Sequence, residues 1–294
     1  MRKILIAVLI IAFSATTVHA SLYTQIAGAL ENMQFFPDVA LDHPNHIAIS
    51  WMADEGAING YPDGTFKPNG LVNRAELMKM VLPEVPEGDY QNCFPDVTTE
   101  WFAPYVCYGL ERGFVNGYPD GTFKPANDVN RVEAMKIILN VHLPENRWPT
   151  PTQAEQELMY PADILEGEWY EGYAKFSIAK ELVDGQHVTQ NPNGSLNYYP
   201  AGPMSRKEVS EMVFRLIIYE AERIVVTGII AEAACYSIEN PGLSAEDVEA
   251  YAYGLFAENG YTAEEADAVS EVLQLDDVVD ADIDVQMVEI CSLQ

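Results

Sequence analysis

The sequence predicts a mainly α-helical protein in which three tandem helix-loop-helix repeats precede a small, acidic helical domain. Two observations carry this prediction. The ten residues 59–68 (NGYPDGTFKP) recur without a change at 116–125, and a pattern typical of a helix start follows each copy. Basic residues also end at Arg223, after which sixteen Asp and Glu residues follow. The two parts of the chain therefore differ in their electrostatics.

Composition excludes several classes of protein. The chain has 294 residues, of which 45 are acidic and 16 basic, and its formal net charge is −29. This charge excludes a nucleic-acid-binding protein of the usual kind, because phosphate contacts need Lys or Arg. It also excludes a polybasic membrane-surface protein. Since 48% of the residues are hydrophobic, the chain can bury a core and is not expected to be disordered.

Residues 1–20 have the pattern of a secretory signal peptide. Arg2 and Lys3 precede an apolar run over 4–13, and small residues stand at the expected cleavage site before Ser21. A membrane anchor would need about 20 apolar residues. Cleavage would remove two basic residues and take the charge from −29 to −31. We therefore expect export and no transmembrane segment in the mature chain.

The repeats are expected at residues 35–82, 93–140 and 160–218. The first two have a Phe-Pro-Asp-Val motif near the start, for which the third has Tyr-Pro-Ala-Asp, and all three have a helix N-cap motif near the end. The third copy is looser, with a longer loop over 186–194. The Pro-Asp-Gly at 62–64 predicts a turn. Asn73 with Glu76 is a capping box that opens a helix over 75–82, and the pattern recurs with Asn130 and Glu133 and with Ser205 and Glu208.

The four cysteines allow three disulfide pairings. The nested pairing, Cys93 with Cys107 and Cys235 with Cys291, keeps each bridge within one region. Oxidised cysteines suit an exported protein. A metal site is the competing interpretation, but the sequence has no CxxC, and no histidine lies near a cysteine. We therefore favour disulfides and expect no metal.

Arg74, Arg131 and Arg206 each follow a helix N-cap directly. A cation there opposes the helix dipole, so three occurrences call for a compensating anion. Free amides and a guanidinium fork suit a carboxylate or phosphate. The anion could be internal, from a carboxylate such as Asp38, Asp96 or Asp163. Against this, lysines accompany the arginines in the first two repeats (Lys67, Lys79, Lys124, Lys136), which favours an external anion.

Together these motifs resemble the S-layer homology (SLH) repeat, whose last motif is usually Thr-Arg-Ala-Glu. The resemblance covers residues 35 to about 218 and implies a pseudo-threefold spindle whose grooves bind an anionic, typically pyruvylated, secondary wall polysaccharide. By position, it implies that the three arginines contact the anion. It further implies that Asp38, Asp96 and Asp163 order the grooves, that Gly60 and Gly117 let sugar approach the backbone, and that Trp101 and Trp169 are the family aromatics.

The sequence departs from that pattern in two places. Trp101 and Trp169 lie sixteen residues before Gly117 and Gly185, but the same count from Gly60 gives Pro44. The first repeat therefore lacks this aromatic unless Trp51 substitutes. The longer loop of the third repeat could leave its groove altered or inactive. A helical tryptophan is also more often a core residue than a sugar platform, so the arginines are the stronger candidates.

The sequence of residues 224–294 predicts an acidic bundle of short helices. Ser244 with Asp247 and Thr262 with Glu265 are further capping boxes, and Gly260 ends the helix between them. The acidic alternation over 280–284 resembles a calcium loop but lacks its Gly and its final Glu. A solvated acidic face is therefore the default interpretation.

The sequence thus predicts a non-catalytic, secreted protein of the cell wall or S-layer that needs no cofactor. Its partner would be an anionic wall polysaccharide, with other surface proteins as further candidates for the acidic domain. A wall-associated glycan hydrolase is an alternative, although no Ser-His-Asp, HExxH or Cys-His arrangement is present. A structural S-layer subunit is another.

Overall fold

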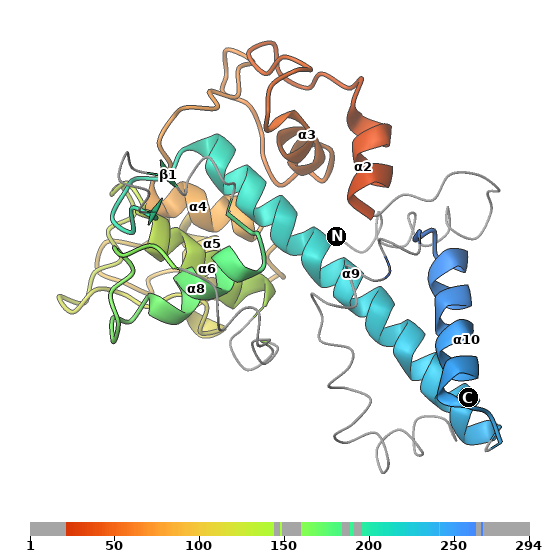
Figure 1. Cartoon of the computed structure of the whole chain (residues 1–294). Helices are drawn as coiled ribbons and strands as arrows, with labels where there is room; N and C mark the ends of the chain where they lie inside the picture. The colour runs from red at the N-terminus through yellow and green to blue at the C-terminus, as the bar shows by residue number, and fades with distance from the viewer. Residues whose placement is uncertain are drawn as a thin grey trace. The chain divides into compact units, whose positions relative to one another are not determined.

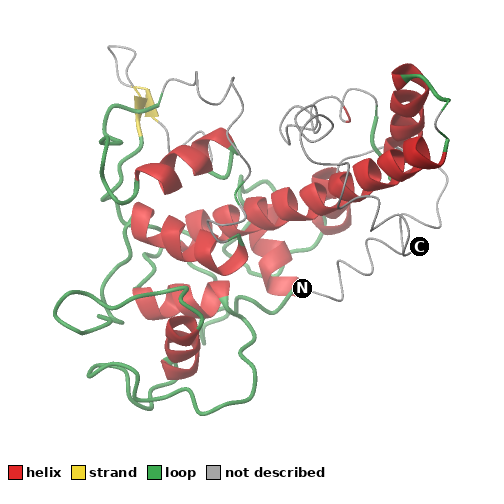
Figure 2. Cartoon of the chain, turned by 90° about the horizontal axis from the view of Figure 1, so that it is seen from below, coloured by secondary structure: helices red, strands yellow, loops and turns green. Residues whose placement is uncertain are grey.

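The computed structural model describes residues 22–143, 148, 160–183, 189–190, 196–240, 242–262 and 266. The chain divides into two compact units, one over 29–217 and the other formed by 1–28 with 218–294. The predicted signal peptide over 1–20 lies outside the described residues. The expected mainly helical fold is confirmed, and the strands among the described residues form a short hairpin (Figures 1 and 2).

In the unit over 29–217, the helices come in pairs, one pair for each segment that the sequence marks as a repeat. We call residues 35–82, 93–140 and 160–218 the first, second and third segments. Contacts join α4 to α5, α4 to α6 and α6 to α8, and these helices lie side by side in Figure 1. The helices are α3 (His46–Asp54), α4 (Arg74–Val81), α5 (Ala103–Glu111), α6 (Arg131–His142), α8 (Glu171–Ala179) and α9 (Arg206–Glu239), with β1 (Thr189–Gln190) and β2 (Leu196–Asn197) in the third segment.

The predicted capping boxes start α4 and α6. Asn73 accepts a hydrogen bond from the Glu76 amide, and Glu76 accepts one from the Asn73 amide. Asn130 and Glu133 repeat both bonds. At the start of α9, the Glu208 carboxylate accepts hydrogen bonds from the amide and the hydroxyl of Ser205. These bonds satisfy amides that a helix start would otherwise leave unpaired, which is why the helices begin at the three arginines.

The loop between the helices of each segment buries an aromatic side chain. Phe66, Phe123 and Tyr198 are all fully buried. The ring centroid of Phe66 lies 5.3 Å from that of Phe36, and the Phe123 centroid lies 5.6 Å from that of Phe94. A loop that anchors such a ring in the core cannot move freely, because removing a buried Phe side chain costs about 3–5 kcal/mol.

Backbone hydrogen bonds connect the three segments in cyclic order. The Arg74 amide donates to the Asn127 carbonyl at 3.0 Å, so the first segment is tied to the second. The Arg131 amide donates to Gly202 at 2.8 Å, which ties the second to the third. The Arg206 amide donates to the Gly70 carbonyl at 2.8 Å, which ties the third segment back to the first. The first residue of each of these helices is therefore hydrogen-bonded to the loop of the next segment.

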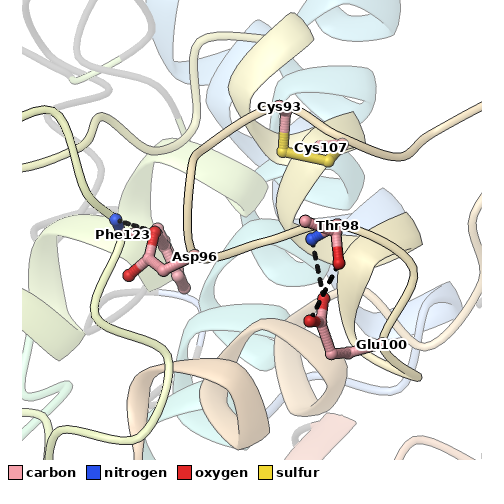
Figure 3. Close-up of a disulfide and its surroundings, with 6 residues drawn as sticks. All are labelled: Cys93, Asp96, Thr98, Glu100, Cys107 and Phe123. Atoms are coloured by element: carbon pink, nitrogen blue, oxygen red, sulfur yellow. Dashed lines mark hydrogen bonds between the residues drawn. A yellow bond between two sulfur atoms is a disulfide. The ribbon is translucent and has the colours of Figure 1, made fainter.

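The disulfide between Cys93 and Cys107 is confirmed, with a Cα–Cα distance of 5.5 Å. It links the entry of the second segment to α5, as Figure 3 shows. Within the loop that it closes, Thr98 donates to Glu100 from its amide and its hydroxyl. The predicted partner of Cys235, Cys291, lies outside the described residues, so that pairing stays a prediction.

The second unit contains α2 (Leu22–Leu30, whose last two residues belong to the other unit), the later part of α9 and α10 (Ala245–Glu258). Its core is a cluster around Ile229, Leu255 and Phe256. Ser244 and Asp247 form the predicted capping box, and Gly260 follows α10 with a φ of +88°. Glu265 and the acidic run over 280–284 lie outside the described residues.

Helix α9 runs without interruption through residues 218–224, where the sequence suggested a change of domain. In the described part of the chain, no helix combines the length and apolarity that crossing a bilayer requires. No cluster of three or more His, Cys, Asp or Glu side chains suited to a metal ion occurs among those residues either.

Candidate functional site

The three arginines occupy equivalent, buried positions. Arg74, Arg131 and Arg206 are only 5–7% exposed, and each lies at the first position of its helix. Each donates to the carbonyl of the buried aromatic residue in the next segment. Arg74 Nε donates to Phe123 at 2.9 Å, Arg131 Nη1 to Tyr198, and Arg206 Nε to Phe66 at 2.8 Å. The guanidinium groups therefore hold the segments together from beneath the loops.

Carboxylates also face the arginines, but they are not the predicted aspartates. Arg74 Nη1 lies 4.0 Å from Glu133 Oε2, and Arg131 Nη2 lies 3.3 Å from Glu208 Oε1. Both glutamates belong to the capping box of the next segment. Burial is the largest influence on Arg206 and lowers its pKa, while the charges of Tyr61, Glu76 and, more weakly, the predicted Asp38 act in the opposite direction. The negative charge near each arginine thus comes from a carboxylate of the next segment.

Asp38, Asp96 and Asp163 instead bind backbone amides within their own segments. Asp96 accepts from Phe123 at 2.9 Å and from Lys124 at 2.8 Å; the first bond is drawn in Figure 3. Asp38 does the same for residues 66 and 67, and Asp163 for residues 198 and 199. Lys67, Lys124 and Tyr199 all have φ values of +56° to +58°. Each aspartate therefore holds a left-handed turn that side chains rarely adopt.

The second segment carries a pocket of about 270 Å³. Its walls are the loop over 114–118, the α6 residues Glu133, Lys136 and Ile137, Arg74 from the first segment and Trp169 from the third. Trp169 is 51% exposed, and Lys136 Nζ lies 5.2 Å from its ring centroid. Tyr118 lies against Arg74 and donates to Glu133 at 2.9 Å; burial is the main cause that raises the pKa of its hydroxyl. We call this the Lys136 groove.

Equivalent residues make the same kinds of contact one segment earlier, at what we call the Lys79 position. Arg206 lies against Tyr61, with 5.0 Å between its guanidinium carbon and the ring centroid, and donates to the Asn59 carbonyl at 3.2 Å. Lys79 Nζ lies 5.9 Å from the ring centroid of Trp101, which is 58% exposed. Both predicted tryptophans are therefore accessible, and each lies beside a lysine.

The third equivalent position, which we call the Glu211 position, has different chemistry. Glu211 stands five residues after Arg206, as Lys79 and Lys136 stand five residues after Arg74 and Arg131. Its carboxylate accepts from Asn45 Nδ2 at 3.1 Å and from Arg215 Nε at 2.7 Å. Trp51 does not replace the missing aromatic, because it is 6% exposed and packs on Phe214.

The lysines that the sequence groups with one arginine separate in the structure. Lys67 pairs with Asp63 at 3.4 Å, and Lys124 pairs with Asp120 at 2.9 Å, both within their own turns. A hydrogen bond from Thr122, and then one from Lys124, lower the pKa of Asp120 to about 2. Lys79 and Lys136 instead lie beside a tryptophan of the following segment.

Gly60 and Gly117 have an internal reason to be glycine. A Cβ on Gly117 would lie 2.6 Å from a ring carbon of Phe94 and 3.0 Å from the Thr122 carbonyl oxygen. A Cβ on Gly60 would meet Phe36 and Thr65 in the same way. The loop folds closely over its aromatic anchor here, so glycine is required by packing whether or not a sugar approaches.

Sequence reasoning missed Tyr61 and Tyr118 as groove residues, and it treated Glu133 only as a cap. The signal was present, because both tyrosines belong to the repeated ten-residue motif. Glu133 has two roles that the sequence could not separate: it caps α6 and also faces Arg74 and Tyr118.

Comparison with known proteins agrees with these features. The S-layer homology domain matches residues 35–78 and 94–135, so these two segments are S-layer homology repeats. This match does not include the third segment, and a third repeat stays a prediction.

Three relatives illustrate the context of these repeats. The cellulosome-anchoring protein of Acetivibrio thermocellus is 29% identical over 40% of this chain and 30% of its own length. An S-layer protein of Bacillus licheniformis is 25% identical over 55% of this chain and 18% of its own. An uncharacterized cell wall amidase of Bacillus anthracis is 29% identical over 47% of this chain and 25% of its own. The chain thus spans less than a third of each relative, and the repeats place it with proteins of the cell surface and wall.

Proposed function

We propose that this chain is a non-catalytic surface protein that its S-layer homology repeats hold on an anionic, pyruvylated secondary polysaccharide of the cell wall. The observation that carries the proposal is the Lys136 groove, where a lysine and an exposed tryptophan lie above a buried arginine. A flat aromatic face suits the apolar face of a sugar ring. The cations beside it suit a carboxylate.

In this proposal, the site residues divide into two groups. Trp101 and Trp169 contact sugar, and the three arginines give the grooves a positive floor. Asp38, Asp96 and Asp163 keep the loops in the conformation that shapes each groove. The close packing of Gly60 and Gly117 keeps these loops low beside the ligand.

We also propose that the third segment is a degenerate repeat that completes a pseudo-threefold spindle. The cyclic order of the backbone hydrogen bonds supports this, as does the equivalence of Arg206 with Arg74 and Arg131. Asp163 binds two successive amides, as Asp38 and Asp96 do. The absence of a matching Tyr-Pro-Asp-Gly turn is consistent with a copy that keeps its structural contacts but has lost groove residues.

Co-sedimentation of the mature protein with purified cell walls tests the proposed function. Walls that carry acidic secondary polymer should retain the protein, and walls from which this polymer has been extracted should not. Binding should weaken as salt is raised, because the contacts are between charges near the surface. Equal retention by extracted walls would contradict the proposal.

A structural S-layer subunit is the second candidate, since several relatives are S-layer proteins. It predicts that the purified chain assembles into sheets when denaturant is removed. The wall amidase among the relatives makes hydrolysis worth measuring as well, by release of amino groups and reducing ends from purified walls. Assembly into sheets would show that the chain is a structural subunit, and hydrolysis would show that it is an enzyme. Either result would replace the proposal of a non-catalytic anchored protein.

A further inference from the structure

We infer that Lys79 and Lys136, and not the motif arginines, decide which grooves accept an acidic sugar, so that the chain has two anion-binding grooves and a third position that takes none. This inference rests on the proposed function and deepens it. The arginine is common to all three positions, whereas the lysine is present at only two. The number of ligands bound therefore separates the two possibilities.

The arginines already have internal partners. Arg74 donates to Phe123 and faces Glu133, and Arg131 donates to Tyr198 and pairs with Glu208. Moving such a guanidinium out of its buried site toward a ligand would break a hydrogen bond to a backbone carbonyl, and leaving that carbonyl unpaired costs free energy. Their main task is to position the loops.

The two groove lysines are placed differently. Both are partly exposed on a helix surface, and neither has a carboxylate within ion-pair distance in the part of the chain that the structure describes. The turn lysines Lys67 and Lys124 are, by contrast, already paired with Asp63 and Asp120. Lys79 and Lys136 lie over exposed tryptophans, so a sugar stacked on the ring would bring its carboxylate to the ammonium group.

At the third position the charge is reversed. Glu211 replaces the lysine, and its carboxylate already accepts hydrogen bonds from Asn45 and Arg215. No exposed tryptophan accompanies it, since the equivalent position is Pro44 and Trp51 is buried. A carboxylate ligand would meet a like charge there and find no aromatic face, and like charges close together repel.

The test counts the ligands that bind the mature full-length protein. The probe is a disaccharide that carries one pyruvate ketal, and its methyl ester is the uncharged control; stoichiometry is read by isothermal titration calorimetry and native mass spectrometry. We expect two sites for the acid and binding at least tenfold weaker for the ester, as loss of a charge-assisted contact implies. Lys79→Gln and Lys136→Gln should each leave one site, and the double variant none.

The controls are matched in charge. Lys67→Gln and Lys124→Gln also remove one cation each, but from lysines that are already paired, and should keep two sites. Lys79→Arg and Lys136→Arg should keep two sites, because they preserve the positive charge that the Gln variants remove. Circular dichroism checks that each variant is folded. Three sites in the natural protein, or two sites in the double variant, would overturn the inference while leaving the proposed function intact. No binding of the acid by the natural protein would contradict the proposed function itself, and the inference with it.

Discussion

Replacing Asp96 by alanine should destabilise the repeat unit by about 2–4 kcal/mol. The Asp96 carboxylate accepts two backbone hydrogen bonds, at 2.9 Å from Phe123 and 2.8 Å from Lys124. Hydrogen bonds to a charged group contribute about 1.5–3 kcal/mol each, and partial exposure of the Lys124 amide reduces the sum. The change also releases a turn in which Lys124 has a φ of +57°. Asp96→Asn keeps one carbonyl oxygen and should lose about half as much.

Urea unfolding followed by tryptophan fluorescence measures this loss in the full chain. All four tryptophans belong to the unit over 29–217, so the signal reports on that unit (Trp51, Trp101, Trp148 and Trp169). Asp128→Ala is the matched control, because Asp128 is exposed and its side chain makes no hydrogen bond or ion pair with the residues that the structure describes. Its free energy of unfolding should stay within about 0.5 kcal/mol of the natural value.

The same variant should weaken wall binding through the loop. The Phe123 carbonyl, one residue before the released turn, is the acceptor for Arg74 at the floor of the Lys136 groove. If Asp96→Ala were as stable as Asp128→Ala, the aspartate would not hold the turn, and the structural role assigned to Asp38 and Asp163 would fail with it.

Three further predictions concern other residues of the unit over 29–217. Arg74→Ala should lower the free energy of unfolding by about 2–4 kcal/mol, because it leaves a buried carbonyl unpaired; an unchanged urea midpoint would refute its positioning role. Reducing the bond between Cys93 and Cys107 should cost about 3 kcal/mol in the chain-entropy model and broaden amide signals of the loop between them; a double serine variant as stable as the oxidised protein would contradict this. Burial lowers the pKa of His142 to about 4. As the pH drops from 6.5 toward 4, His142 therefore takes up a proton in the unfolded chain but not in the folded chain, and the free energy of unfolding falls by up to about 3 kcal/mol. His142→Gln should remove this part of the pH dependence in urea titrations between those pH values.

The local features of the repeats could be predicted from the sequence because each depends on residues close together in the chain. Asn73 and Glu76 form the predicted capping box, and Cys93 and Cys107 form the predicted disulfide. Such signals need only three to fourteen residues of spacing. The exact repetition of the turn motif also indicated that both copies fold alike.

The composition of the Lys136 groove could not be predicted in the same way, because this groove combines three segments. The Lys136 groove takes Arg74 from the first segment, Lys136 from the second and Trp169 from the third. The sequence places Lys79 five residues after Arg74 in the first segment, yet the structure brings Lys79 beside Trp101 of the second segment. Which segments supply the residues of one groove follows from the cyclic order in which the backbone hydrogen bonds connect them. No local sequence pattern encodes that order.

The strong net charge of the chain is compatible with the proposed local binding of an acidic polymer. Interactions between exposed charges are largely screened beyond about 8 Å at physiological ionic strength. An acidic sugar in the Lys136 groove would therefore interact mainly with charges at its walls, which are Lys136, Arg74 and Glu133. These sum to one positive charge, whereas the Glu211 position adds a carboxylate in place of the lysine. If the proposal holds, selectivity for an anion would depend on one residue at each position, while the overall charge of −29 opposes nonspecific binding to other polyanions.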